Sequence, residues 1–434
     1  MPAPKKLHLT PMQQEVRELS DRIVEAQRPI RVLDAVRFGN EEIKKKFFEQ
    51  KGKELPDIPK NYYESRPLSF DSKEKKRELY GIERDIRKKL GQFTGVGNIM
   101  ERMCREYREV VRMLNARGTD EFSFISQELY GSSQDAFYAG APTLQDLGKL
   151  LANTLPELKK NLSHSDEVKI YTGEDAVSIL SKELNAYFGE NEEQTRVKVS
   201  DNIIADASAG AECIKLRQDA MFSKRDLRVL EVHEGWVHLG TTLNGMAQPI
   251  CTFLSKGPPS STITQEGLAI ITEIFTFSSF PDRVHRLINR VNAIAMAENG
   301  ADFLDIYHFF EEQGLDGNAA YSAASRVFRG SLPDGLPFTK DLVYSKGFIL
   351  IYNYIRLAVQ RGLLSMIPLL FVGKTTLEDL HILEDLVNEG LVTLPVYLPP
   401  PFRDLSGLSA WMCYSLFLNK LDLGQLALSY QNLF

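Results

Sequence analysis

Hydrophobic residues recur every three to four positions along most of this chain, and this period predicts a mainly helical protein. Capping residues, glycines and prolines set the expected helix limits. The ranges expected in the N-terminal part are Thr10–Ala26, Arg31–Gln50, Ser72–Leu90, Gly97–Ala116, Thr119–Tyr130 and a segment from Thr143 to about Pro156. The ranges expected further along are Gly173–Phe188, Lys224–Thr242, Ile263–Phe277, Pro281–Ala297, Asp302–Glu312, Asn318–Arg329, Phe338–Gln360, Leu377–Asn388 and Leu405–Asn419.

A short central region alternates between apolar and polar residues instead, which predicts strands. The candidates are Val168–Tyr171, Arg196–Ser200, Ile203–Ala207 and Glu212–Arg217, with a turn at Gly210. Strands followed directly by long helices indicate a small sheet in a mainly α protein of the α+β class. This change of pattern predicts two parts, an N-terminal helical region at 1–160 and a second domain at 161–434.

Composition and targeting signals predict an ordinary globular protein in the cytoplasm. The 434 residues are 43% hydrophobic and 25% charged, which is typical of such proteins. The most apolar long stretch, 348–372, is interrupted by Arg356, Arg361 and Pro368, so we expect no membrane span. The N-terminus lacks an apolar signal core, and the four cysteines form no CxxC pair, which favours a reducing compartment.

The charge distribution gives no reason to expect a nucleic-acid partner. The net charge is −6, although basic residues are in excess near the N-terminus. The basic runs Lys44–Lys46 and Lys73–Arg77 lie among glutamates, as on solvated helix faces. Docking on an acidic partner stays an alternative for this region.

The motif that indicates chemistry is His233-Glu-Gly-Trp-Val-His238, in a predicted helix. Zinc peptidases usually carry HExxH, where a four-residue spacing puts both rings on one helix face. Five residues of regular helix turn about 500°, so the rings would diverge by about 140°. We therefore expect a π-bulge near Gly235–Val237, where glycine makes distortion easier. Glu234 then holds the position of the general base.

A third metal ligand is expected from Glu266 in the segment STITQEGLA at 261–269. Thr262 and Gln265 have the spacing of a capping box, which predicts that a helix begins here with Glu266 in its first turn. An acid there has a simpler explanation, because it complements the helix dipole. However, a His-His-Glu set is a known catalytic zinc pattern, so we expect one Zn²⁺ per chain bound by His233, His238 and Glu266.

The HExxxH motif and QEGLA, about thirty residues later, together resemble one family. It comprises the flavohaemoglobin expression-modulating QEGLA-motif proteins and the related microtubule-associated tyrosine carboxypeptidase. The likeness continues through Thr242-Leu-Asn-Gly245, Arg326-Val-Phe-Arg-Gly330 and Phe338-Thr-Lys-Asp-Leu-Val-Tyr344. The resemblance implies a gluzincin-like zinc metallopeptidase domain at 161–434, with Glu234 as the catalytic acid/base.

Further site residues are expected in the blocks that carry this resemblance. A carboxypeptidase needs a cation for the terminal carboxylate of its substrate, and Arg326, Arg329 and Lys340 are the candidates. Tyr344 is a candidate for stabilising the oxyanion. Each has a structural alternative, since Arg329 resembles a cation at a helix end and Tyr344 a half-buried core residue.

We therefore predict zinc-dependent removal of a C-terminal residue from a peptide or protein. Two alternatives stay open: another zinc amidohydrolase, which the same site would serve, and a non-enzymatic regulatory protein that binds metal. The motifs specify neither the oligomeric state nor the identity of the substrate.

Overall fold

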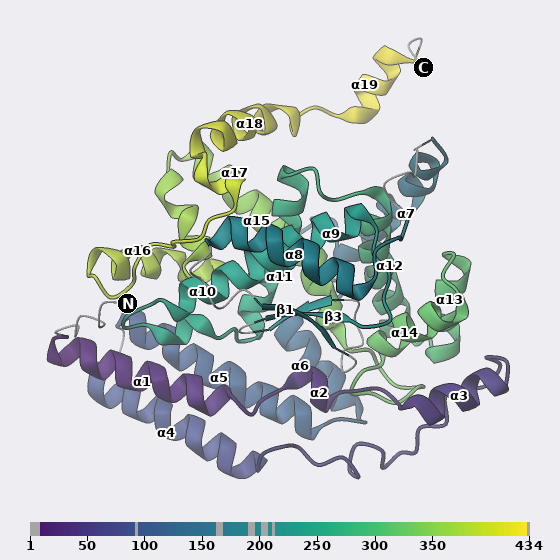
Figure 1. The fold of residues 1–434 in the computed structure, drawn as a ribbon, viewed down its shortest axis with the longest axis horizontal. Coiled ribbons are helices and arrows are strands. Elements are labelled where there is room, and N and C mark those ends of the chain that lie inside the picture. Colours follow the sequence, from purple (N-terminus) through teal and green to yellow (C-terminus); the bar gives the residue numbers. More distant parts are fainter. Residues whose placement is uncertain are drawn as a thin grey trace.

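The structure, a computed structural model, describes residues 9–91, 94–161, 168–189, 196–200, 207–210 and 213–431. Within these ranges the protein is mainly α with one small three-stranded sheet, as the sequence predicts. Figure 1 shows long N-terminal helices along one side, the sheet in the middle, and α18 and α19 projecting from the opposite side. No described helix is long and apolar enough to cross a membrane.

The N-terminal helices form a layer along the lower side of the view in Figure 1. Its long members are α1 (Pro11–Gln27), α4 (Ser72–Leu90), α5 (Gly95–Asn115) and α6 (Asp120–Tyr130). Helix α1 begins where Thr10 and Gln13 form a capping box, which satisfies free N–H groups. In α5 the predicted apolar face, including Met103, Tyr107 and Leu114, is buried, so this helix anchors the layer.

Two of the expected N-terminal helices have the wrong limits. The segment Arg31–Gln50 is not one helix but two, α2 (Val32–Ala35) and α3 (Glu41–Glu49). Gly39 separates them at a φ of +61°, which favours glycine, and the Asn40 side chain caps α3. Helix α7 (Leu144–Asn161) continues through Pro156 instead of stopping there. Pro156 is exposed, so water can replace the hydrogen bond that proline cannot donate.

The sheet is small and lies against helix α8 (Gly173–Phe188). Its strands are β1 (Arg196–Ser200), β2 (Ala207–Ala209) and β3 (Cys213–Arg217). The central strand β3 pairs in parallel with β1 and antiparallel with β2. The strand expected at Ile203–Ala207 falls mostly outside the described residues. The strand expected at Val168–Tyr171 is wrong, because only one bridge, from Tyr171 to Phe222, forms there.

One continuous helical rod carries the histidine motif. Its three parts are α9 (Lys224–Leu230), the π-helix η2 (Glu231–Leu239) and α10 (Gly240–Met246). The rod begins where Ser223 and Asp226 form a capping box. Trp236 of η2 shares a core cluster with Leu184 of α8 and Ile214 of β3, so the sheet and α8 fix one side of the rod.

Two glycines allow two helices to cross in backbone contact near the site. Helix α11 (Pro259–Phe275) crosses α15 (Val343–Gln360) there. A Cβ atom on Gly267 would lie 2.3 Å from the carbonyl carbon and oxygen of Gly347. The backbones therefore touch, which explains why QEGLA carries a glycine at this point.

The other helices complete the body around these elements. They are η3 (Thr252–Ser255), α12 (Pro281–Glu298), α13 (Phe303–Glu312), α14 (Gly317–Val327), η4 (Thr339–Leu342), η5 (Leu364–Met366), η6 (Pro368–Phe371), η7 (Leu377–Asp379), α16 (Leu380–Asn388), α17 (Pro400–Arg403), α18 (Leu405–Leu418) and α19 (Leu423–Tyr430). The largest core cluster contains residues from Val16 to Met412. Both sides of residue 160 thus share this core, and the division into two domains stays a prediction.

Candidate metal centre

The π-helix η2 brings the two histidines of the motif onto one face. The ring centroids of His233 and His238 lie 4.7 Å apart with the planes perpendicular. A π-helix closes its hydrogen bonds five residues apart, as the bond from the Gly240 N–H to the Gly235 carbonyl shows. The predicted distortion is confirmed, and it extends over nine residues instead of a single bulge.

Glycine and hydroxyl side chains favour this geometry locally. A Cβ atom on Gly235 would lie 2.3 Å from the Leu184 side chain, so the glycine allows α8 to approach the π-helix. The Thr241 hydroxyl donates to the Val237 carbonyl at 2.7 Å, and the Thr242 hydroxyl donates to the His238 carbonyl at 2.8 Å. These side chains bond carbonyls at the end of the π-segment, where the regular α pattern is interrupted.

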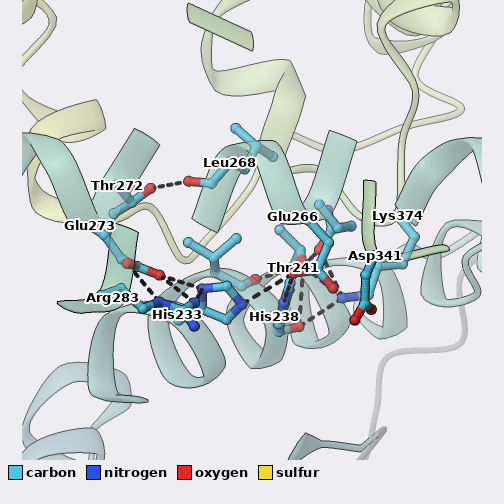
Figure 2. Close-up of polar contacts among 12 residues, drawn as sticks. His233, His238, Thr241, Glu266, Leu268, Thr272, Glu273, Arg283, Asp341 and Lys374 are labelled. Atoms are coloured by element: carbon cyan, nitrogen blue, oxygen red, sulfur yellow. Dashed lines mark hydrogen bonds and ion pairs between the residues drawn. The ribbon is translucent and has the colours of Figure 1, made fainter. Parts of the chain in front are cut away.

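Glu266 of α11 points between the two imidazoles (Figure 2). Its Oε2 lies 3.2 Å from Nε2 of His233 and 3.4 Å from Nε2 of His238. The expected position of Glu266 in a first helical turn is wrong, because α11 already begins at Pro259. Proline suits the first position of a helix, so Thr262 and Gln265 form no capping box. Gln265 Oε1 instead lies 2.7 Å from Thr241 Oγ1.

A buried carboxylate holds the first histidine from behind. Glu273, fully buried in α11, lies 2.7 Å from Nδ1 of His233. The Arg283 guanidinium donates to both Glu273 oxygens, at 3.0 and 3.3 Å. Burial raises the pKa of Glu273, but Arg283 and His233 outweigh it and hold the pKa at about 2. The spacing of seven residues from Glu266, two turns along one helix face, could have identified this residue.

A half-buried lysine holds the second histidine through its backbone. The Lys374 ammonium donates to the His238 carbonyl at 2.9 Å, and to Thr241 Oγ1 and Gln265 Oε1 at 3.0 Å each. Burial lowers the pKa of Lys374 to about 7. Lys374 follows η6 in the chain, far from the motif, and no sequence pattern pointed to it.

The donor set fits a zinc ion. The ligand atoms of His233, His238 and Glu266 all lie within 4.8 Å of one another. Two ligands at about 2.1 Å from a tetrahedral zinc are separated by about 3.4 Å, close to the two distances from Glu266. When Nδ1 of His233 donates its proton to Glu273, the Nε2 lone pair faces the centre, as in metal-bound histidines.

The predicted substrate-binding cations gather near this centre, and the structure separates them into two kinds. Arg326 makes a bidentate ion pair with Asp341 at 2.9 and 3.0 Å, so its guanidinium already has a carboxylate partner. The side chains of Arg329 and Lys340 make no hydrogen bond or ion pair with any part of the described chain. Arg329 is only 8% exposed, and burial, together with Arg326, lowers its pKa to about 10. Burial also lowers the pKa of Lys340, while the Glu266 carboxylate opposes this shift.

The predicted catalytic residues Tyr344 and Glu234 also lie at the centre. The Tyr344 ring lies 6.3 Å from the His233 ring at an interplanar angle of 25°. Burial, reinforced by the Glu266 carboxylate, raises the pKa of Tyr344 above its usual value. Glu234 is half-buried on η2, and its charge acts on His233 and Lys374. Both catalytic candidates are therefore within electrostatic reach of the donor set.

A polar cavity of about 300 Å³ opens beside His238 and Glu266. It is lined by hydroxyl groups and two lysines, among them Thr242, Ser255, Lys256, Ser261, Thr262 and Lys374. The cavity provides space for a polar substrate group next to the donor set.

A buried amide in the resembling block has a structural role. The Asn244 side chain donates to the carbonyls of Phe371 and Tyr397, both at 2.8 Å. It also accepts from the N–H groups of Val396 and Tyr397, at 3.0 and 2.9 Å. Asn244 therefore fastens two C-terminal loops to the rod.

Two histidines on one helix and a glutamate from another form a donor set of the metallopeptidase class. The family model of the microtubule-associated tyrosine carboxypeptidase matches residues 45–420. The chain belongs to this family. Among solved structures, Trypanosoma cruzi metallocarboxypeptidase 1 is similar, with a TM-score of 0.42 and 12% identity, over 87% of this chain and 90% of that one. No curated protein matches the chain significantly.

Proposed function

We propose that this protein is a zinc-dependent peptidase that removes single C-terminal residues. The observation that carries the proposal is the convergence of three metal donors beside two cations, buried Arg329 and half-buried Lys340, whose side chains make no hydrogen bond or ion pair with the described chain. Membership of a carboxypeptidase family supports it. His233, His238 and Glu266 would hold one zinc ion in a gluzincin-like domain at 161–434.

The chain's own groups supply the proton transfers of this reaction. When bound, zinc supplies Lewis acidity that polarises the scissile carbonyl and promotes ionisation of water. Glu234 takes a proton from the water as its oxygen bonds to the carbonyl carbon. It passes that proton to the amine nitrogen as the C–N bond breaks, so the products are a shortened peptide and a free amino acid. The raised pKa of Tyr344 keeps its phenol protonated, so it can donate to the oxyanion.

Arg329 and Lys340 are the residues that we assign to the terminal carboxylate of the substrate. Removing a cation from water without giving it a partner costs free energy. The carboxylate of a bound substrate would supply that partner to both side chains. Arg326 is less suited to this role because Asp341 already occupies its guanidinium. Its proposed contribution is to hold Asp341, whose charge also acts on Arg329 and Lys340.

The substrate in this proposal is a peptide or protein with a free C-terminus. We also propose a cytoplasmic location, in keeping with the four free cysteines. A nucleic-acid substrate is not favoured, because the basic runs of the chain lie among glutamates, as on solvated helix faces.

The test is digestion of a peptide mixture by the purified protein, followed by mass spectrometry. We expect loss of single C-terminal residues from free peptides and none from the same peptides with C-terminal amides. Internal cuts, or equal cleavage of the amides, would contradict the carboxypeptidase assignment.

Two variants test the third metal ligand and the general base independently. Glu234→Gln is expected to keep about one zinc per chain, the content expected of wild type, but to lose peptide hydrolysis. Glu266→Ala is expected to lose zinc by elemental analysis. Equal zinc in Glu266→Ala and wild type would remove the third-ligand assignment, and an active Glu234→Gln would remove the general base.

A further inference from the structure

The C-terminal arm, defined here as residues 405–431, exposes an unusual amount of apolar surface. Helix α18 buries Leu408, Met412 and Ser415, on the side that packs against α15. Its sequence, LSGLSAWMCYSLFL, contains no charged residue. A helix that is apolar on all sides is normally covered on all sides. Helix α19 buries no residue at all, so the arm is incompletely covered.

The exposed residues of the arm form a set large enough for a stable protein interface. They are Trp411, Tyr414, Phe417, Leu418, Leu421, Leu423, Leu428 and Tyr430. Each is between 39% and 78% exposed. Because a large aromatic side chain covers about 150–250 Å², these eight residues expose roughly 1,000 Å² together. A standard interface buries about 800 Å² on each partner, so the arm has sufficient area.

The charges of the arm indicate what kind of partner it fits. Lys420 and Asp422, between the two helices, are its only charged residues. A highly charged protein would leave its own charges unpaired on this surface. A helix that lies on a membrane surface needs a basic polar face, which the arm lacks. With 14 residues, α18 is shorter than the roughly 20 that a membrane span requires.

We propose that the arm is the interface of a homodimer, with the arm of a second copy as its occupant. A second copy presents the same apolar and nearly neutral surface, which is the self-complementarity of a two-fold interface. Figure 1 shows α18 and α19 projecting from the body, where another molecule can reach them. None of the residues lining the cavity beside His238 and Glu266 belongs to the arm, so the inference is independent of the proposed activity.

The matched family region ends at residue 420, so α19 lies beyond it. The proposed interface therefore includes a segment that the family match does not cover.

Sedimentation velocity over a wide concentration series tests the proposal with the full chain. We expect wild type to reach twice the 49.1 kDa mass of one chain. The triple variant Trp411→Ser, Tyr414→Ser, Phe417→Ser should sediment as a single chain at the same concentrations. A matched control changes Phe124, Tyr138 and Leu150 to serine; these apolar residues are 54%, 71% and 64% exposed elsewhere, and this variant should remain dimeric.

Three results would overturn the homodimer. Wild type could sediment as one chain at every concentration, or both triple variants could associate to the same extent. Monomeric wild type could also bind phosphatidylcholine vesicles, which would make a lipid surface the occupant. If the aromatic variant loses its helical circular dichroism, the pair Leu423→Glu and Leu428→Glu replaces it, because α19 buries no residue whose loss could unfold the body.

Discussion

Replacing Gly267 by alanine puts one methyl group at the point where α11 touches α15. The new Cβ would lie 2.3 Å from two backbone atoms of Gly347, whereas ordinary contacts begin at 3.4 Å. The helices would have to separate by about 1 Å, because no rotamer change can move backbone atoms out of the way. Overpacking of this kind costs about 1–3 kcal/mol.

The same displacement should reach the metal centre, since Glu266 precedes Gly267. Metal ligands are held within about 0.2 Å of their preferred distances, so a shift of this size should weaken zinc binding at least tenfold. We expect a fall in Tm of about 2–6 °C, at about 2 °C per kcal/mol for a large domain. Thermal unfolding by circular dichroism and zinc titration against a chromophoric chelator measure the two effects.

Gly81→Ala is the matched control for this experiment. Gly81 lies inside α4, and no atom lies within 4 Å of its ideal Cβ position. Alanine there should be neutral or stabilise the protein by up to about 1 kcal/mol. If Gly267→Ala kept the Tm and zinc affinity of wild type, the inferred backbone contact would be wrong. Equal losses in both variants would also refute it, because a general effect of alanine would then suffice.

Three further perturbations follow from the site. Glu273→Gln should weaken zinc binding about 10–100-fold, as measured by chelator competition; unchanged affinity would exclude its orienting role towards His233. Arg329→Met should raise KM for peptides with a free C-terminus at least tenfold, with kcat less affected, in a peptide-release assay; an unchanged KM would exclude carboxylate binding. Asn244→Ala should lower the free energy of unfolding by about 2–4 kcal/mol in urea, because four hydrogen bonds from the buried Asn244 side chain to backbone groups are lost; a change below about 0.5 kcal/mol would contradict this.

The sequence predicted the distorted helix because two facts conflicted. A single metal requires His233 and His238 on one face, and a regular α-helix separates them. The π-helix resolves this conflict. The start of α11 was not predictable from the capping pattern alone, because Pro259 begins the helix upstream of Thr262. Local patterns thus identified the candidate metal ligands but placed the start of helix α11, which carries Glu266, too late in the sequence.

Residues that support the metal ligands were harder to predict from the sequence than the ligands themselves. Glu273 lies two turns from Glu266 on the same helix, and periodicity could have identified it. Lys374 reaches the His238 carbonyl from a residue 136 positions away, where only the three-dimensional fold joins them. The ion pair of Arg326 with Asp341 also could not be predicted. The sequence shows two charged residues, but only the fold shows that they pair with each other.

The π-helix also explains how the rod accommodates the extra residue of the histidine motif. Deleting one residue between His233 and His238 would restore the four-residue spacing that suits an α-helix, and the imidazoles would still share a face. Because the chain would turn by the same amount between the two histidines in both forms, the later residues of the rod would keep their directions. Thr241 would still face α11, and Asn244 would still hold the C-terminal loops. A four-residue and a five-residue motif are therefore interchangeable in this rod when the segment changes from π-helix to α-helix.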